Sequence, residues 1–309
     1  MARPALSAAR AVDVLNFLAS HPNEGFTLSE LVRRLGINVA SMHAILAVLA
    51  QAEYVTRDDD RRTYGTGPML VPLGYAALRR HGAIVSARDE LATLTSELGV
   101  TGLIVGSAGA EMVILDEVAA TANGSQTVGQ RIRMVAPMGG VFVAWSEHER
   151  IEQWLARAPA GVRKQRADLE RWLESIREQG YAVGLETTAR QELRRAVRDL
   201  REEPGSRSAK GRLRSNVAQL GDIATVLLEA NPQDSYEIAH IAAPVPAHDG
   251  VTLSLYLMGF RRPLSAYELE RAGERLRGAA RNAASSTVDQ DGSSRTAGSE
   301  SDPHAGVIW

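Results

Sequence analysis

The sequence predicts an α+β protein: an N-terminal winged helix-turn-helix domain, a linker helix, and a C-terminal domain with an antiparallel sheet and helices. Three observations support this prediction. Two short helical segments with capping signals lie close together near the N-terminus. A charged turn between two strand-like segments follows them, and the rest of the chain places strands first, helices in the middle, then strands and a helix.

The first helix is expected from residue 7 to about residue 18, with Ser7 as its cap. Its apolar side chains have a helical spacing, at Ala8, Ala11, Val12, Leu15 and Leu18. Residues 21–25, His-Pro-Asn-Glu-Gly, interrupt this pattern and are expected to form a turn.

The second and third helices form the predicted helix-turn-helix. Thr27 and Glu30 have the spacing of a capping box, and the helix they open closes at Leu35-Gly36. The third helix runs from Asn38 to about Gln51. Its buried side is expected to consist of Val39, Met42, Ile45, Leu46 and Leu49. In a helix-turn-helix the second of the two helices enters the DNA major groove.

A hairpin over residues 54–65 follows, with Asp58-Asp59-Asp60 in its turn and arginines near its tip. This hairpin is the predicted wing. The alternative is a small helical packing unit with a hairpin. The order of helix, capped helix, helix and wing within one short segment favours DNA binding.

Composition limits the classes of function. The 309 residues suffice for two domains and a tail, and the formal net charge of -2 gives no global basic field. Residues 1–80 carry nine arginines against seven acidic residues, so any attraction to phosphates is local and a dimer would double it.

Several activities are not expected. The chain has no cysteine, which excludes disulfides and thiolate chemistry. No apolar run approaches the ~18 residues of a membrane span, and the N-terminus is not a signal peptide, so a cytoplasmic protein without membrane partners is expected. Residues 106–109, Gly-Ser-Ala-Gly, do not form a nucleophile elbow, and Asp58–Asp60 lack calcium-loop spacing. We therefore expect no enzyme, no catalytic residue, no metal and no cofactor.

The expected domain boundaries are 1–67 for the winged domain, 68–82 for the linker helix, 83–285 for the C-terminal domain and 286–309 for a disordered tail. The linker helix is unusually apolar, and it is expected to pack either on its own domain or on a second copy of the chain. Within the C-terminal domain, residues 187–235 do not fit the simple scheme; they combine a charged helix, a basic loop and a short apolar segment. The other elements expected there are helices at 89–98, 138–145, 146–158, 166–178 and 264–284, and strands at 101–106, 112–118, 127–133, 236–243 and 251–260.

With both halves considered, the chain resembles the isocitrate lyase regulator (IclR) family of bacterial transcription factors over residues 6 to about 284. The segments that carry the resemblance, in family order, are 28–37 (LSELVRRLGI), 54–68 around the wing, 128–131 (VGQR), 180–183 (GYAV) and 241–245 (IAAPV). The resemblance implies a C-terminal effector-binding domain, and it makes residues 187–235 an insertion relative to the common pattern.

The resemblance and the chemistry of the head together define candidate DNA-binding residues. They are Thr27, Ser29, Asn38, Val39, Ala40, Ser41, Met42, His43, Arg57, Arg61 and Arg62. The recognition helix lacks the arginine usual in the family. Base reading is therefore expected through the polar side chains of Asn38, Ser41 and His43, with Val39 and Met42 against thymine methyls. The wing arginines are expected to meet phosphates or a minor groove.

The candidate ligand-binding residues are Met134, Met138, Gly139, Gly140, Val141, His240, Tyr256 and Met258. Pro137 is expected at the first position of a helix whose free amides, from residue 138 to residue 140, face an anionic or carbonyl group. By the resemblance, His240 stands at the family's pocket cysteine. Tyr256 and Met258 stand at its paired hydroxyl positions. The alternative for His240 and Tyr256 is a purely structural place in the core.

These observations lead to two hypotheses. The first is a regulator, repressor or activator, that binds a double-stranded DNA operator as a homodimer or homotetramer. Its DNA affinity would be modulated by a small apolar or aromatic acid. The second is a ligand-binding and assembly module whose DNA-binding head has lost specificity. The missing arginine of the recognition helix is the feature that favours the second.

Overall fold

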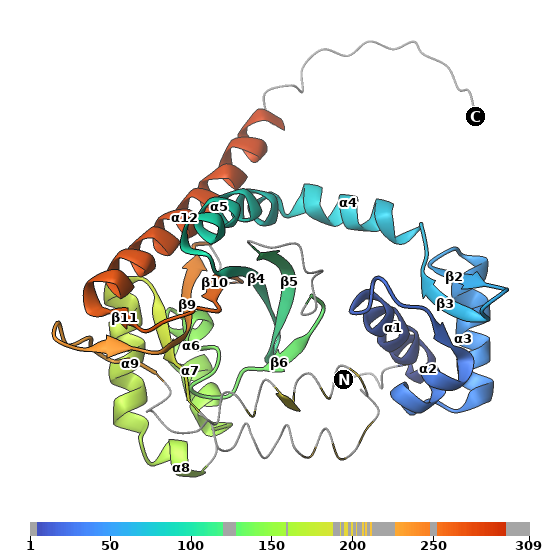
Figure 1. The fold of residues 1–309 in the computed structure, drawn as a ribbon, viewed down its shortest axis with the longest axis horizontal. Coiled ribbons are helices and arrows are strands. Elements are labelled where there is room, and N and C mark those ends of the chain that lie inside the picture. Colours follow the sequence, from blue (N-terminus) through green and yellow to red (C-terminus); the bar gives the residue numbers. More distant parts are fainter. Residues whose placement is uncertain are drawn as a thin grey trace.

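The computed structural model describes residues 5–119, 128–158, 160–187, 226–247 and 252–294, with single residues between 192 and 211. The chain forms an N-terminal head (residues 5–67) and a larger C-terminal domain that begins at residue 82. A single exposed helix, α4 (Leu70–Arg80), connects them (Figure 1). This arrangement agrees with the α+β class and the order of parts predicted from the sequence.

The head confirms the predicted helix-turn-helix and wing. Its helices and strands are α1 (Leu6–Ala19), β1 (Phe26–Thr27), α2 (Leu28–Leu35), α3 (Val39–Gln51), β2 (Val55–Asp58) and β3 (Thr63–Thr66). The strand order is β1-β3-β2, so the wing hairpin gains a third strand from the turn before α2. The sequence analysis did not anticipate β1, because two residues are too few to show an alternating pattern.

Capping explains where α2 and α3 begin. Thr27 and Glu30 form the predicted capping box, and Gly36 ends α2 in the left-handed conformation at φ 68°. The Asn38 side chain accepts a hydrogen bond from the Ser41 amide at the start of α3. The prediction for Ser7 is wrong: α1 begins at Leu6, and no side chain caps it.

The core of the head lies between its three helices. Its buried side chains are Val14, Phe17, Leu18, Phe26, Leu31, Ile37, Met42, Ile45, Leu46, Leu49 and Val55. Two expected core residues are instead exposed, Val12 at 53 % and Val39 at 59 %. Helix α1 turns Val14, Phe17 and Leu18 inward, so Val12 falls on another face.

The C-terminal domain is built on one antiparallel sheet with the strand order β6-β5-β4-β10-β9-β7. Its strands are β4 (Thr101–Ala108), β5 (Glu111–Ala119), β6 (Arg131–Arg133), β7 (Ala182–Leu185), β9 (Ile238–Val245) and β10 (Leu253–Met258). Two further short strands, β8 (Ser235–Tyr236) and β11 (Leu264–Ser265), pair with each other. The predicted antiparallel sheet is thus confirmed.

Helices cover both faces of this sheet (Figure 1). One face packs against α5 (Gly82–Leu98) and α12 (Ala266–Ser294). The other face packs against α6 (Gly140–Val143), α7 (His148–Ala156) and α9 (Arg166–Gln179), and we call it the effector face. A short helix, α8 (Ala160–Arg163), links α7 to α9.

Several predicted boundaries require correction. The expected helix over 138–145 shrinks to the four residues of α6, and α5 begins at Gly82 rather than near residue 89. Helix α12 continues to Ser294, ten residues beyond its expected end at 284 and into the expected tail. Most of residues 187–235, where a charged helix, a basic loop and a short apolar segment are expected, lies outside the described residues.

In the part of the chain that the structure describes, no single helix has the length and apolar character needed to cross a membrane. The pair α2 and α3, bent by 116°, passes that test together by length and composition only.

Candidate DNA-binding surface and effector site

The outer surface of α3 presents small and apolar side chains beside one histidine. Val39, Ala40 and His43 are exposed, as a recognition surface requires. Ser41 is half-buried, and its hydroxyl accepts a hydrogen bond from Arg10 Nη1 at 3.2 Å. The Asn38 side chain caps α3, so this face offers little hydrogen bonding. The face therefore combines the apolar side chains of Val39 and Ala40, which suit thymine methyls, with the hydrogen-bonding ring of His43.

The prediction for Met42 as a thymine contact is wrong. Its side chain is fully buried in the core of the head. Along α3, exposed and buried positions alternate with the helical period of 3.6 residues. Met42 falls on the same side of α3 as Ile45, Leu46 and Leu49.

Arg10 is a residue that the sequence analysis missed. It lies on α1, and its guanidinium reaches the first turn of α3 at Ser41. The two residues are 31 positions apart in the chain. No local pattern could have indicated the contact. The helix α3 carries no arginine of its own, but the Arg10 guanidinium lies beside its first turn.

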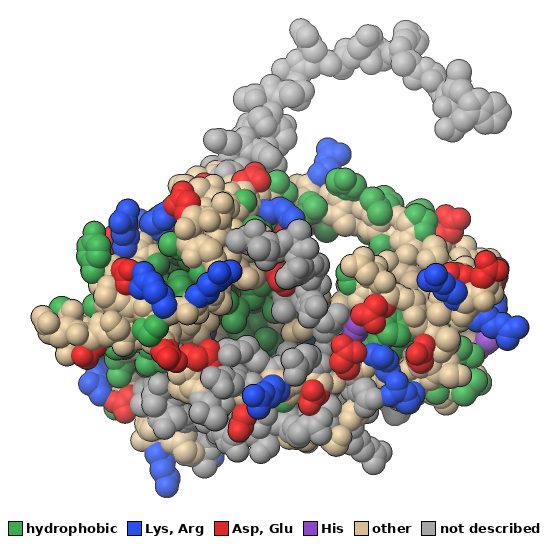
Figure 2. Space-filling model, viewed as in Figure 1, with side chains coloured by type: hydrophobic (Ala, Val, Ile, Leu, Met, Phe, Trp, Pro, Cys, Tyr) green, Lys and Arg blue, Asp and Glu red, His purple; other side chains and the backbone are tan. Residues whose placement is uncertain are grey.

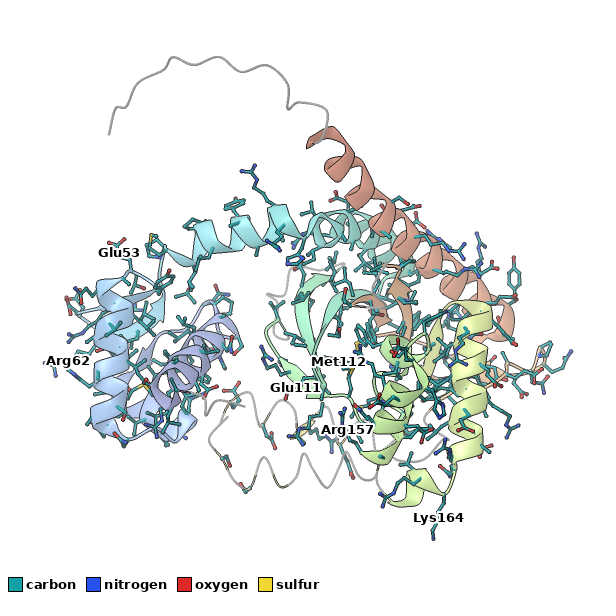
Figure 3. The ribbon with its side chains drawn as sticks, turned by 180° about the vertical axis from the view of Figure 1, so that it is seen from behind. Glu53, Arg62, Glu111, Met112, Arg157 and Lys164 are labelled. Atoms are coloured by element: carbon teal, nitrogen blue, oxygen red, sulfur yellow. The ribbon has the colours of Figure 1, made fainter. Side chains whose placement is uncertain are left out.

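The wing carries three exposed arginines, Arg57, Arg61 and Arg62. Arg62 lies at the outer edge of the head, away from the C-terminal domain (Figure 3). The Asp58 side chain accepts hydrogen bonds from the amides of Asp60 and Arg61, each at 3.0 Å, and so builds the turn. Asp59 lies 3.3 Å from Arg57 Nε and partly offsets its charge.

The two remaining candidates, Thr27 and Ser29 at the start of α2, differ in exposure. Ser29 is exposed, whereas Thr27 is half-buried and occupied in the capping box. Hydrogen bonds from the backbone and side chain of Thr27, with the nearby guanidinium groups of Arg34 and Arg33, lower the pKa of Glu30. Thr27 therefore positions α2.

On the effector face, the predicted ligand-binding residues of the sheet lie together. His240 on β9 pairs in register with Met258 on β10, and its ring centroid lies 5.4 Å from that of Tyr256. The Tyr256 hydroxyl donates to Met112 Sδ at 3.8 Å, a weak hydrogen bond. Met112 was not predicted, because nothing in the sequence indicates that β5 lies opposite Tyr256.

The predicted residues from the segment before α6 join the same cluster in part. Met134 and Val141 are buried in it, and Met138, Tyr256 and Met258 pack against it half-buried. The structure thus gathers sulfur-containing and aromatic side chains over one face of the sheet. Such side chains adapt to flat apolar ligands.

The role predicted for the two glycines is wrong. A Cβ on Gly140 would lie 2.3 Å from Trp172 Cζ3, so the indole ring occupies the space expected for a ligand. A Cβ on Gly139 would lie 2.7 Å from Met134 Cγ. These glycines permit close packing of the protein against itself.

The predicted helix N-terminus also differs. Helix α6 starts at Gly140, three residues after Pro137, and the Gly140 amide donates to the Pro137 carbonyl at 3.3 Å. The Met138 carbonyl accepts from Trp154 Nε1 at 2.9 Å. Among the described residues, Trp172 Nε1 is a buried donor without an acceptor, and sequence analysis did not single it out.

No group of three or more His, Asp or Glu side chains able to hold a metal occurs among the residues that the structure describes.

A winged helix-turn-helix head attached to a domain built on one antiparallel sheet is the architecture that the comparisons with known proteins have to match. Residues 7–59 match the family model of the IclR helix-turn-helix domain. The chain is 24 % identical over 254 residues to the probable HTH-type transcriptional regulator ArcR of Halobacterium salinarum, covering 78 % of this chain and 88 % of that protein. It is also 31 % identical over 102 residues to the HTH-type transcriptional regulator BhcR of Paracoccus denitrificans, covering 32 % of this chain and 36 % of that protein.

Solved structures share the whole fold. An IclR transcriptional regulator from Alicyclobacillus acidocaldarius superposes with a TM-score of 0.64 at 21 % identity, covering 92 % of this chain and 99 % of that one. An IclR homolog from Microbacterium hydrocarbonoxydans, complexed with 4-hydroxybenzoate, gives a TM-score of 0.57 at 16 % identity, covering 92 % and 99 %. The head of this chain thus matches the IclR helix-turn-helix domain, and the chain as a whole is similar to IclR transcriptional regulators in sequence and fold.

Proposed function

We propose that this regulator binds an operator through the outer surface of α3 and the arginines of the wing, and that a small aromatic or apolar acid on the effector face changes its DNA affinity. The observation that carries the DNA-binding part is the joint exposure of Val39, Ala40 and His43 on α3 with Arg61 and Arg62 on the wing. Phosphate contacts from the wing would supply most of the affinity.

The ligand class follows from the surface that the effector face presents. Methionines and a tyrosine would contact a flat ring, and His240 would pair with a carboxylate when protonated. The 4-hydroxybenzoate bound to the structurally similar homolog is a molecule of this class. The ligand can shift DNA affinity only by its differential affinity for two states of the protein, commonly 1–3 kcal/mol.

A homodimer completes the proposal. Helix α4 contributes no buried residue, and Val71, Leu73, Tyr75 and Leu78 on it are exposed. Hydrophobic side chains follow the helix in Figure 2. A helix with exposed apolar residues on several sides normally packs against a partner, and a second copy would also supply the second head for a two-part operator.

The experiment is a titration of the protein into fluorescently labelled DNA from its own upstream region, with and without 4-hydroxybenzoate as the probe ligand. Specific binding that changes with the probe supports the proposal. Equal affinity for upstream and scrambled DNA would support the second candidate, an assembly module without DNA specificity. The absence of any Lys or Arg between Val39 and Gln51 favours that candidate.

A further inference from the structure

The head carries a buried polar pocket that the proposed DNA contacts do not use. The side chain of His21 has no exposed surface, and its Nδ1 lies 2.8 Å from the Phe17 carbonyl oxygen. A carbonyl oxygen only accepts, so Nδ1 carries the proton in this contact. Nε2 points the other way and has no hydrogen-bond partner among the described residues.

Arg34 forms the second side of the pocket. Its guanidinium lies 5.0 Å from the ring centroid of Phe26 and 5.8 Å from that of Phe17. The centroid of the His21 ring lies 4.4 Å from that of Phe17 and 5.2 Å from that of Phe26. The guanidinium lies above an apolar aromatic floor, where a carboxylate is the complementary group. His21 Nε2 faces the same point, and it attracts a carboxylate when the ring is doubly protonated.

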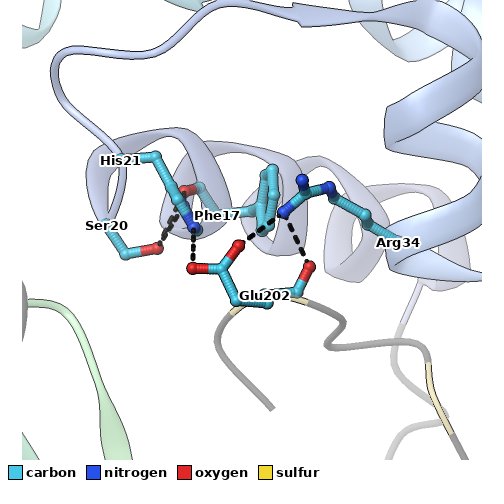
Figure 4. Close-up of polar contacts among 5 residues, drawn as sticks. All are labelled: Phe17, Ser20, His21, Arg34 and Glu202. Carbon is cyan, nitrogen blue, oxygen red and sulfur yellow. Dashed lines mark hydrogen bonds and ion pairs between the residues drawn. The ribbon is translucent and has the colours of Figure 1, made fainter. Parts of the chain in front are cut away.

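Glu202 occupies this position (Figure 4). Arg34 Nη1 donates to the backbone carbonyl and to Oε2 of Glu202, each at 2.9 Å. The other carboxylate oxygen lies 3.9 Å from His21 Nε2. The contact joins residues 168 positions apart in the sequence.

Glu202 belongs to the segment 187–235, and the end of that segment is attached to the C-terminal domain. Val226 pairs with Gly184 of β7, and the Leu227 amide donates to the Val183 carbonyl at 3.1 Å. Strand β7 lies next to β9, which carries His240. Val226 and Leu227 are thus held at the edge of the sheet, and Glu202 of the same segment contacts the head.

We propose that His21 and Arg34 form a carboxylate-binding pocket whose occupant is Glu202 of the same chain, and that this contact is a second attachment of the head to the C-terminal domain. The first attachment is α4, which has no buried side chain. Packing of α4 therefore does not fix the orientation of the head relative to the C-terminal domain. Together the two attachments restrict that orientation, and the chain that carries the second one returns to the sheet beside β7.

The test measures the distance between spin labels on the two parts. The chain has no cysteine, so Gln51→Cys on α3 and Lys164→Cys after α8, both exposed, provide two unique labelling sites. We expect a narrow distance distribution in the otherwise unchanged protein. We expect it to broaden in Glu202→Gln and in Arg34→Gln, and to broaden no further in the double variant. Glu229→Gln, exposed in the same segment, is the matched control and should leave the width unchanged.

Two results would overturn the proposal. One is an unchanged distribution in Glu202→Gln with native circular dichroism. The other is broadening of the labelled native chain when it is mixed with excess unlabelled Glu202→Gln protein, since the pocket would then hold the glutamate of another copy.

Discussion

The rings of His240 and Tyr256 lie 5.4 Å apart on neighbouring strands, tilted by 42° to each other. Both side chains stand on the effector face, and Tyr256 also reaches Met112 on β5. An imidazole and a phenol thus meet over a floor of methionines. This pair is the place where we propose that an aromatic acid binds.

The first prediction concerns the Tyr256 hydroxyl. Its present acceptor is a thioether sulfur, a weak one, so a ligand oxygen would be a better partner. Tyr256→Phe should weaken binding of 4-hydroxybenzoate by about 0.5–1.5 kcal/mol, the usual net contribution of one hydrogen bond. Calorimetry measures this loss. Tyr267→Phe, at a tyrosine that is 70 % exposed, is the control, and equal affinity in both variants would remove Tyr256 from the site.

The second prediction concerns Gly140 and Trp172. Gly140→Ala places a methyl group where the Trp172 ring lies, and overpacking of this kind costs about 1–3 kcal/mol. Thermal unfolding should show the loss. Gly278→Ala is the matched control, because nothing lies within 4 Å of the added Cβ on α12, and replacing a helical glycine there should raise stability by about 0.5–1 kcal/mol. A Gly140→Ala protein as stable as the native one would contradict the packing described.

The third prediction concerns α4. Tyr75→Glu places a charge on a helix whose exposed apolar residues are proposed to pack against a second copy. Sedimentation at micromolar concentration should show a dimer for the native chain and a monomer for the variant. Arg80→Gln, at the end of the same helix, should remain dimeric. A native monomer with full affinity for the operator would refute the dimer.

The fourth prediction concerns acid stability at the start of α12. Hydrogen bonds from Arg262 and then from Ser265 lower the pKa of Glu268 from 4.5 to about 2. A carboxyl group whose pKa is lower in the folded state stabilises it above pH 4.5, and this contribution disappears as the pH falls through about 2. Glu268→Gln should therefore flatten the pH dependence of unfolding between these values. Glu270→Gln, exposed on the same helix, should retain the native slope.

Local signals in the sequence predicted much of the fold. The capping box of Thr27 and Glu30 began α2 and the left-handed Gly36 ended it as expected, because each signal acts within a few residues of the chain. The wing turn built by Asp58 was predictable for the same reason. Ser7 failed as a cap, because helix α1 begins before it.

The parts of the candidate sites that escaped prediction depend on contacts between distant segments. A glycine permits close approach to a ligand or to a side chain, and only the fold shows that Trp172 fills the space at Gly140. Arg10 beside Ser41 and Glu202 beside Arg34 are pairings of the same kind. Met42 was predicted both on the buried side of the third helix and as a base contact. The structure supports only the first, because one step of 100° on a helix separates a buried position from an exposed one.

The central claim is that the head binds DNA through its wing and α3, and the salt dependence of DNA affinity tests it most directly. Each phosphate contact adds about 0.9 to the slope of log affinity against log salt concentration. Replacing Arg61 and Arg62 together by alanine should lower that slope by about one to two units and weaken all sequences alike, whereas His43→Ala should change the preference at one or two base positions. A slope that is unchanged in the Arg61 and Arg62 double variant would contradict the account, because the wing would then lie outside the DNA interface.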